Sequence, residues 1–428
     1  MTISRQLLFL SSMVITIGAT RGLVQTISSS WLSHLICLVI GAVLLPTTKR
    51  ILKQTLDNPL AQSNVTAAGN HNTNHYVYNL GHARLNVTLP PQTMWMNMGF
   101  WRVRTYTPTF YNFRSDTATQ DTREFPQACE ALLKEILKTA GLLAPDETPI
   151  SVPAERWTTL VDVGFGCGDQ TLYLTQKLRK CIQVDPLKSP CRTEMPLLDT
   201  YTGITLDAGQ ANHACERLRS NGLIDDPKIR LYCGDAANVE TWSKLNKVLD
   251  LTGEMRGMTK TAIFSPATTR SELKESWILA LDSLYHFSPS RKPILEYAHN
   301  ESKASVMAFD LVLSDSASAT ARFVLSCVAK LMGCPTNAFV TENEYRALLI
   351  SAGYHQRNIQ MRDISEHVFA PLTNFLNGRE KLLMDFGWGL GNLVAAKWLF
   401  GWWARSGVVR GVIVVARHER SLVGSVDD

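Results

Sequence analysis

Hydrophobic positions along this chain alternate between two spacings from residue 125 onward. Short runs of β-branched and apolar residues, typical of buried strands, are separated by segments in which apolar residues recur every three or four positions. Strands that alternate with helices predict an α/β fold with a doubly wound, mostly parallel sheet. The predicted strands are 158–163, 202–207, 229–237, 277–287, 309–316, 359–365 and 408–416, and predicted helices include 125–140, 208–218 and 342–352.

The most informative stretch follows the first of these strands. Three glycines stand at alternate positions, Gly164, Gly166 and Gly168, and Asp169 then occupies the expected N-cap of a helix. A strand, a glycine turn and a helix N-terminus form a crevice where backbone N–H groups can face a ligand without obstruction by Cβ atoms. The pattern therefore predicts a ligand site, and a glycine-rich turn without a ligand is the simpler alternative.

The glycine spacing distinguishes between ligands. A dinucleotide fingerprint places its third glycine five residues after the first, whereas here the interval is four, and Asp162 lies two residues before the first glycine. The run Asp-Val-Gly-Phe-Gly-Cys-Gly resembles the first motif of class I S-adenosylmethionine-dependent methyltransferases. This resemblance implies a Rossmann-like methyltransferase sheet of about seven strands with the last one antiparallel, and cofactor contacts from Asp162, Gly164, Gly166, Cys167 and Gly168. A nucleotide-binding relative remains the competing interpretation.

A second motif begins at the next strand. The run Gly-Ile-Thr-Leu-x-x-x-Gln, which ends at Gln210, resembles the second motif of the tocopherol, sterol and cyclopropane-fatty-acid branch of these methyltransferases. The resemblance implies that Thr205, Leu206 and Gln210 contact the ribose and adenine of the cofactor. Most class I enzymes use an acidic residue near this strand end instead, so Asp207 is the alternative to the pair of Thr205 and Gln210.

Two later strand ends complete the predicted site. Asp235 and Ala236 occupy the place where the family binds the adenine amino group. Asp282 is expected to close the cofactor crevice at the carboxyl end of its strand, where ligands of open α/β sheets bind. His286 is the candidate general base because imidazole titrates near neutrality, and Tyr285 is the second catalytic candidate. A purely structural histidine is the alternative.

The N-terminal region has a different composition. No Asp, Glu, Lys or Arg occurs from residue 22 to residue 48, a length sufficient to span a bilayer. We expect residues 1–56 to form hydrophobic helices that anchor the chain, followed by a polar linker over 57–91. A signal peptide or a buried helical hairpin is the alternative. Lys49, Arg50 and Lys53 favour a cytosolic location for the residues that follow.

Residues 92–428 are expected to form the methyltransferase domain, with an N-terminal cap over 92–150 and the catalytic core over 151–428. The cap contains Asn97-Met-Gly-Phe-Trp101, which is similar to a segment that helps to close over the ligands in methyltransferases of small lipophilic substrates; an aromatic packing cluster is the alternative. Residues 386–407 hold four of the ten tryptophans. They predict either a helix at a membrane interface or a packed lid helix.

Charge and cysteine patterns narrow the choice of partners. Removing the five cations of residues 1–53 from the total of 43 leaves 38 basic residues against 38 acidic ones, which does not suggest a nucleic-acid surface. The nine cysteines lack the paired spacing of a zinc site, and we expect no metal.

The sequence thus predicts a membrane-associated methyltransferase that uses S-adenosyl-L-methionine. The expected acceptor is a lipophilic small molecule such as a sterol, a prenylquinone, a lipid or a specialised metabolite, and the methylated atom stays open. The expected location is the endoplasmic reticulum or another endomembrane, with the catalytic domain in the cytosol. An NAD-binding oxidoreductase and a catalytically inactive membrane-tethered scaffold are the rival functions, and the oligomeric state is undetermined.

Overall fold

The structure is a computed structural model, and all the residues that it describes belong to one structural unit, Asn79–Asp428. The predicted membrane anchor in residues 1–56 lies outside the described residues, as does most of the predicted linker. Among the helices that are described, none is both long enough and apolar enough to cross a membrane. The described residues are 89, 91–102, 124–153, 156–182, 193–244, 246–247, 274–331, 335, 338–391 and 393–419.

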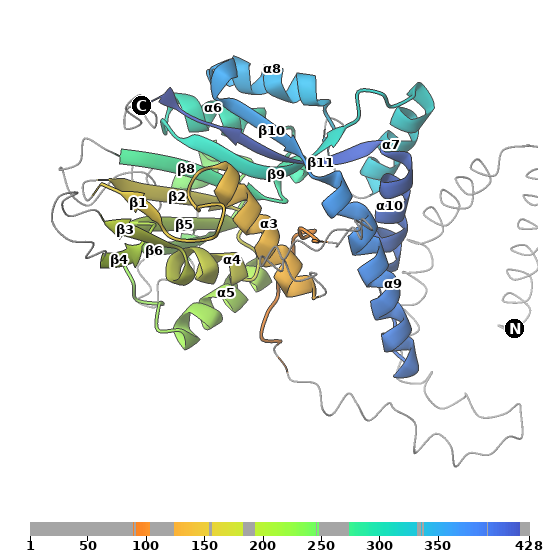
Figure 1. Ribbon diagram of the computed structural model, residues 1–428, viewed down its shortest axis with the longest axis horizontal. Coiled ribbons are helices and arrows are strands. Elements are labelled where there is room, and N and C mark those ends of the chain that lie inside the picture. The colour runs from red at the N-terminus through yellow and green to blue at the C-terminus, as the bar shows by residue number, and fades with distance from the viewer. Residues whose placement is uncertain are drawn as a thin grey trace, which may run out of the picture. The chain divides into compact units, whose positions relative to one another are not determined.

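A central sheet of eight strands forms the core, in the order β10-β11-β9-β8-β2-β5-β6-β7 (Figure 1). The adjacent strands β9, β8, β2, β5 and β6 are parallel to one another. Strand β11 is antiparallel to both of its neighbours, β9 and β10, and the two-residue strand β7 adds an antiparallel edge beside β6. This confirms the expected seven-stranded sheet with an antiparallel last strand, and β7 is an addition. The strands are β2 (Trp157–Val163), β5 (Thr200–Thr205), β6 (Ile229–Cys233), β7 (Asn246–Lys247), β8 (Lys274–Leu281), β9 (Ser305–Leu313), β10 (Ile359–Asp363) and β11 (Val409–Ala416).

A second, smaller sheet was not anticipated from the sequence. It consists of β1 (Ile150–Val152), β3 (Arg179–Ile182) and β4 (Thr193–Pro196), with β3 parallel to β1 and antiparallel to β4. These strands are three or four residues long, so they offer too few positions for a recognisable alternation of apolar and polar residues.

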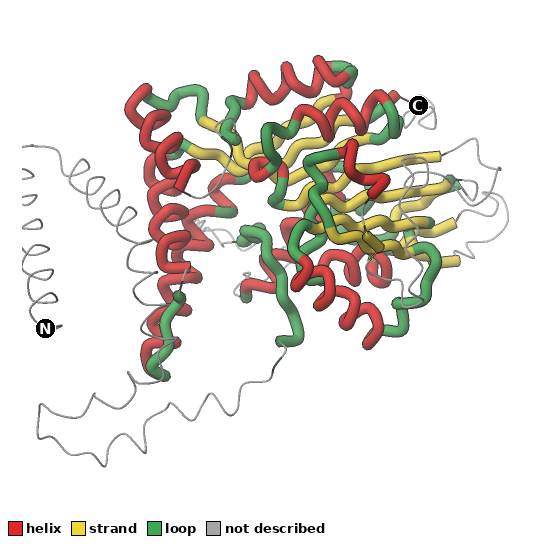
Figure 2. Tube along the Cα trace, turned by 180° about the vertical axis from the view of Figure 1, so that it is seen from behind, coloured by secondary structure: helices red, strands yellow, loops and turns green. Residues whose placement is uncertain are grey.

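Helices cover both faces of the central sheet (Figure 2). Along β8, Trp277 and Leu279 belong to one buried cluster, while Ile278 and Ala280 belong to the other, because successive side chains of a strand point to opposite faces. The first cluster includes residues of α3, α5, α9 and α10, and the second includes residues of α6 and α8. The helices are α3 (Phe125–Thr139), α4 (Asp169–Leu172), α5 (Ala208–Ser220), α6 (Lys292–Asn300), α7 (Ala319–Leu331), α8 (Glu342–Ala352), α9 (Phe369–Asp385) and α10 (Leu393–Ser406).

Helix boundaries follow local signals in most places. Helix α8 begins with a capping box, in which the side chains of Thr341 and Glu344 bond reciprocally to backbone N–H groups, and it ends at Gly353 in the left-handed conformation. The helix after the glycine turn differs from the prediction. Gly168 is its N-cap and Asp169 its first residue, and after one α-helical turn it continues as a π-helical turn over Tyr173–Lys177.

Candidate active site

The candidate site lies at the point where the strand order of the central sheet reverses. From β2 the chain proceeds through β5 and β6 on one side, and then returns to add β8 and β9 on the other side. A crevice at the carboxyl ends of the strands is expected at such a switch point, and it is the usual ligand position in open α/β sheets. The glycine turn after β2 and Asp282 after β8 both lie at this edge.

The glycine turn requires glycine for conformation and for space. Gly164, Gly166 and Gly168 have φ angles of +111°, +61° and +90°, a region that side chains with a Cβ atom rarely adopt. A Cβ added at Gly168 would lie 2.9 Å from the Cβ of Ala214, so this glycine allows the turn to approach α5. A Cβ at Gly166 would meet only the sulfur of Met96, at 3.8 Å. Gly168 therefore serves packing, whereas Gly166 borders open space.

That open space is a cavity of about 230 Å³. Met94–Asn97 line it from one side, and the glycine turn, the end of β5, the start of α5 and the residues after β8 complete the lining. Eight residues predicted for the site line this cavity, namely Gly164, Gly166, Cys167, Thr205, Gln210, Asp282, Tyr285 and His286. The five that do not are Asp162, Gly168, Leu206, Asp235 and Ala236.

Asp162 lies beneath the glycine turn. Its carboxylate is fully buried and accepts hydrogen bonds from the Gln170 side-chain amide at 2.8 Å and from the Tyr201 hydroxyl at 2.7 Å. Burial raises the pKa of Asp162 to about 7, against the lowering effect of these two donors. This residue joins β2, β5 and α4 under the turn and does not line the cavity, so its contact with a cofactor stays a prediction.

The second motif separates into a cavity-lining pair and a cap. The hydroxyl of Thr205 donates to the side-chain oxygen of Gln210 at 3.2 Å, and both residues line the cavity. Asp207 is the N-cap of α5 and accepts the backbone N–H of Gln210 at 2.8 Å. Of the two alternatives left open by the sequence, the pair lines the cavity and Asp207 does not; which of them contacts a cofactor stays a prediction. Leu206 is 74% exposed and does not line the cavity.

The third predicted contact lies on the neighbouring strand end. The backbone N–H of Gly234 donates to the carbonyl of Thr205 at 2.8 Å, which holds the segment after β6 against the end of β5. Asp235 is exposed, and its carboxylate accepts the N–H of Ala237 at 2.9 Å. Ala236 is buried. Both residues follow β6, the strand beside β5, but their contact with a cofactor stays a prediction.

Asp282 lines the cavity at the end of β8, the strand beside β2. It adopts a φ angle of +64°, which is unusual for any residue other than glycine and frequent at functional sites. Its carboxylate accepts the N–H of Met98 at 3.0 Å. Burial raises its pKa to about 7, while hydrogen bonds from the Tyr285 side chain and the Met98 N–H lower it. A carboxyl group near its titration point thus borders the open space.

The predicted fourth strand ends earlier than expected. Strand β8 stops at Leu281, and Leu284–His286 form a 3₁₀ turn, so His286 lies on a turn rather than on a strand. The Ser283 hydroxyl anchors this segment by donating to the carbonyl of Val163 at 2.7 Å. The rings of Tyr285 and His286 lie 4.1 Å apart, and burial lowers the pKa of His286, which favours the neutral imidazole that a general base requires.

The cap segment, residues 92–101, crosses the cavity and is held by the two carboxylates at its rim. The N–H of Met94 donates to Asp169 at 2.9 Å, just as that of Met98 donates to Asp282. Within the segment, the Asn97 side chain accepts the N–H of Gly99 at 2.9 Å. Residues 94–97 of the predicted cap therefore supply part of the cavity lining, and closure of the cap over a ligand stays a prediction.

Arg217 is a site residue that the sequence analysis did not identify. Its guanidinium pairs with Asp169 and donates to the carbonyls of Cys167 and Gln92, both at 3.2 Å. It joins α5, the glycine turn and the cap segment. Its position one helical turn after Ala214, which packs on Gly168, is the sequence signal that could have revealed it.

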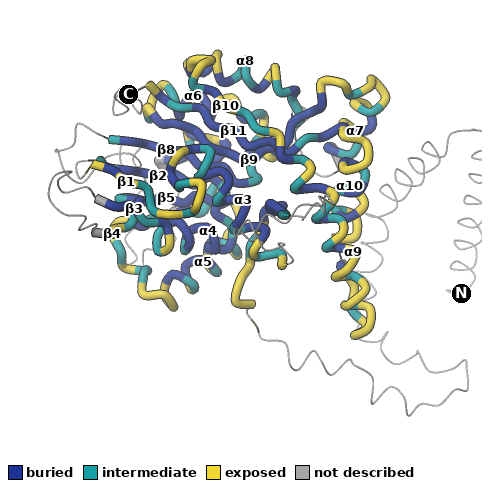
Figure 3. Tube along the Cα trace, in the orientation of Figure 1, coloured by how far each residue is buried: buried dark blue, intermediate teal, exposed yellow. Residues whose placement is uncertain are grey.

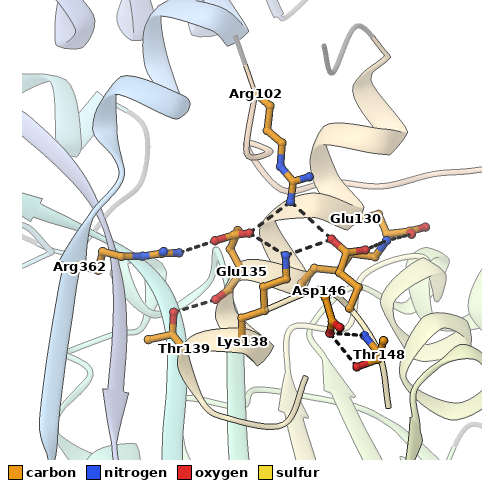
Figure 4. Close-up of polar contacts among 10 residues, drawn as sticks. Arg102, Glu130, Glu135, Lys138, Thr139, Asp146, Thr148 and Arg362 are labelled. Carbon is orange, nitrogen blue, oxygen red and sulfur yellow. Dashed lines mark hydrogen bonds and ion pairs between the residues drawn. The ribbon is translucent and has the colours of Figure 1, made fainter. Parts of the chain in front are cut away.

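An ionic cluster on α3 secures the far end of the cap segment (Figure 4). Glu135 accepts hydrogen bonds from Arg362 at 2.8 Å and Lys138 at 3.2 Å, and Arg102 approaches it at 3.4 Å. Burial raises the pKa of Glu135, but Arg362 and Lys138 outweigh it and lower the pKa overall. Since Arg102 directly follows Trp101, the cluster links the cap segment to α3 and β10.

Comparisons with known proteins find matches among solved structures alone, all at low sequence identity. No protein-family model and no curated protein sequence matches this chain. Similar solved structures include a geranyl diphosphate methyltransferase in complex with SAM, with 14% identity over 68% of this chain and 86% of that chain and a TM-score of 0.40. A putative sarcosine dimethylglycine methyltransferase from Galdieria sulphuraria shares 13% identity over 76% and 92%, with a TM-score of 0.45.

A further solved structure bears a different functional name. The cyclase SpnF shares 14% identity over 80% of this chain and 93% of its own, with a TM-score of 0.43. Methyltransferases are thus prominent among the similar structures, but identities this low do not assign an activity. Any functional assignment therefore has to come from the cavity and its lining residues.

Proposed function

We propose that this protein transfers a methyl group from S-adenosylmethionine to a lipophilic small molecule. The observation that carries the proposal is the convergence of the glycine turn, the pair of Thr205 and Gln210, and Asp282 around one cavity at the switch point of the sheet. Three motifs far apart in the sequence meet there, in the order that the resemblance to class I methyltransferases implies.

The lining suits the proposed cofactor. The bare backbone at Gly166 leaves a cradle that a side chain would fill, and Gln210 offers an amide for the nucleoside end. Asp282 places a carboxylate on the rim, which favours a cationic ligand when ionised. When bound there, S-adenosylmethionine would supply an electrophilic methyl group on a sulfonium. The chain's own task is to orient the acceptor against that group.

The remaining lining indicates the acceptor. Met94, Trp95, Met96, Phe165 and Leu281 contribute apolar surface to the cavity. These side chains can exclude water and hold an apolar molecule, and aromatic faces can favour the sulfonium cation. For a hydroxyl or phenol acceptor, His286 is the proposed proton acceptor, with Tyr285 orienting the substrate. For a carbon or amine acceptor, the base acts later or is not required.

Membrane association forms part of the proposal and rests on sequence. The uncharged run over 22–48 and the cations that follow it support an N-terminal anchor with the domain of residues 92–428 on the cytosolic side of an endomembrane. This arrangement would give the site access both to a cytosolic cofactor and to an acceptor dissolved in the bilayer.

Calorimetric binding of S-adenosylmethionine and of NAD tests the cofactor assignment. The Gly166→Val substitution should abolish S-adenosylmethionine binding, because it fills the cradle and strains a φ angle of +61°. Gly222→Val is the matched control, since Gly222 has a φ angle of +69°, lies outside the cavity lining and has no atom within 4 Å of the point that a Cβ would occupy. Binding of NAD alone would establish an oxidoreductase, and binding of neither would support an inactive scaffold.

The reaction itself is tested with methyl-labelled S-adenosylmethionine and total membrane lipids, followed by mass analysis of the products. Replacement of His286 by alanine should lower turnover of the labelled product while cofactor affinity stays nearly unchanged. A large loss of cofactor affinity in this variant would instead assign His286 a structural role, and the absence of any labelled lipid would contradict the lipophilic acceptor.

A further inference from the structure

Helices α9 and α10 form a hairpin whose free end exposes an apolar surface. The two helices pack against each other and extend away from the sheet in both views (Figures 1 and 2). Of the thirteen large hydrophobic residues that are exposed in the described part of the chain, six lie at this end. We call them the hairpin tip, and they are Leu382, Met384, Phe386, Leu393, Val394 and Trp398.

The hairpin tip is not required by the core of the domain. Trp403, on the inner side of α10, is 1% exposed and packs its ring against Phe369 at 5.5 Å and Phe400 at 5.7 Å. Met384 and Trp398, in contrast, are 67% and 60% exposed, and the end of α9 is drawn as exposed in Figure 3. Clustered apolar exposure of this kind marks an interaction surface.

The charges beside the hairpin tip favour an anionic partner. Lys397 is buried and pairs with Glu380, so these two charges compensate each other within the hairpin. The exposed charged residues on α9 are then Arg379 and Lys381 against Asp385. An exposed tryptophan and aliphatic side chains bordered by cations are the composition of elements that lie in the interface of an anionic bilayer.

Helix α9 links the hairpin tip to the cap segment. The ring of Phe375 lies 5.1 Å from that of Trp101, at the end of the cap segment, and 5.9 Å from that of Phe125. Leu382 follows Phe375 by seven residues, or about 10 Å along an α-helix. A bilayer in contact with the tip would therefore lie near the segment that covers the cavity.

We propose that the hairpin tip docks into the interface of an anionic lipid bilayer and so brings the cap segment to the membrane surface. The sequence supports a bilayer as the partner, because the same chain carries an uncharged run of bilayer-spanning length over residues 22–48. The inference rests on the proposed membrane association, but it does not depend on methyl transfer.

Site-specific fluorescence in the full-length protein tests this docking. The Leu393→Cys variant is labelled with a polarity-sensitive fluorophore and reconstituted into phosphatidylcholine vesicles with or without phosphatidylserine. Ile350→Cys on α8, an equally accessible apolar position away from the hairpin, is the matched control, and identically treated wild type gives the background from native cysteines. Met384→Cys provides a second reporter on the other helix.

Docking predicts that the labels at positions 393 and 384 shift to shorter wavelength, lose most of their emission to nitroxide-bearing lipids and resist aqueous iodide, most strongly with phosphatidylserine. The label at position 350 should keep its emission wavelength, lose little emission to nitroxide-bearing lipids and be quenched by aqueous iodide. Iodide quenching of all labels alike would overturn the proposal, and protection from both quenchers would overturn it in favour of coverage by residues 1–56 or a second copy. Calorimetry with S-adenosylmethionine on the same samples keeps a failure of the proposed function separate from a failure of docking.

Discussion

Two carboxyl groups at the ends of adjacent strands show how neighbours decide a role. Asp162 on β2 is fully buried, whereas Asp282 after β8 is half-buried and lines the cavity, and burial raises the pKa of each to about 7. The donors to Asp162 are Gln170 of α4 and Tyr201 of β5. Asp282 borders the cavity and holds the cap segment through the N–H of Met98. Carboxyl groups with a similarly raised pKa therefore lie beneath the glycine turn in one region and at the cavity in the other.

The largest expected effect concerns the supporting region. Gly168→Val places a side chain against Ala214 at a φ angle of +90°, so we expect a loss of roughly 3 kcal/mol in the free energy of unfolding from strain and overpacking. Urea denaturation followed by circular dichroism measures it. Gly222→Val, with similar φ but open surroundings, should lose only about 1 kcal/mol. Equal losses in the two variants would show that Gly168 is not needed for packing.

The next largest effect concerns Asp162 and the pH dependence of the free energy of unfolding. Its raised pKa means that the folded chain keeps a proton which the unfolded chain releases, so its stabilising contribution is complete below about pH 4 and is lost as the pH rises through 7. Between pH 5 and pH 7, Asp162→Asn should therefore gain about 2 kcal/mol in unfolding free energy relative to the wild type. Parallel stability curves across this range, measured by urea denaturation, would contradict the raised pKa.

The smallest effect concerns Asp282 and the pH dependence of the affinity for S-adenosylmethionine. Ionisation of this carboxyl near pH 7 should strengthen binding of the cationic cofactor, so the wild-type affinity for S-adenosylmethionine should rise from pH 5.5 to pH 8. Asp282→Asn should bind about tenfold more weakly at pH 8 and nearly equally at pH 5.5. Asp162→Asn is the control in the same calorimetric titration and should keep the wild-type pH dependence. If both variants lost it, the contrast between the two carboxyl groups would fail.

Most strands and the position of the crevice were predictable because their signals are local. The run 158–163 shows the apolar, β-branched composition of a buried strand, and only glycine tolerates the positive φ angles of the turn that follows. Helix α8 matches its predicted limits because its cap and its terminal glycine are both encoded nearby. His286 was assigned to a strand because an apolar run does not reveal where a strand gives way to a turn.

The sequence by itself determined the α/β alternation, the glycine turn and eight of the seventeen cavity-lining residues, since spacing and backbone chemistry act over a few positions. Only the tertiary structure decided that Asp162 lies beneath the turn, that Arg217 joins three segments, and that Asp169 and Asp282 hold the cap segment. Met94 reaches Asp169 across 75 positions and Met98 reaches Asp282 across 184. Such contacts depend on how the whole sheet brings distant strand ends together, which no local pattern of residues encodes.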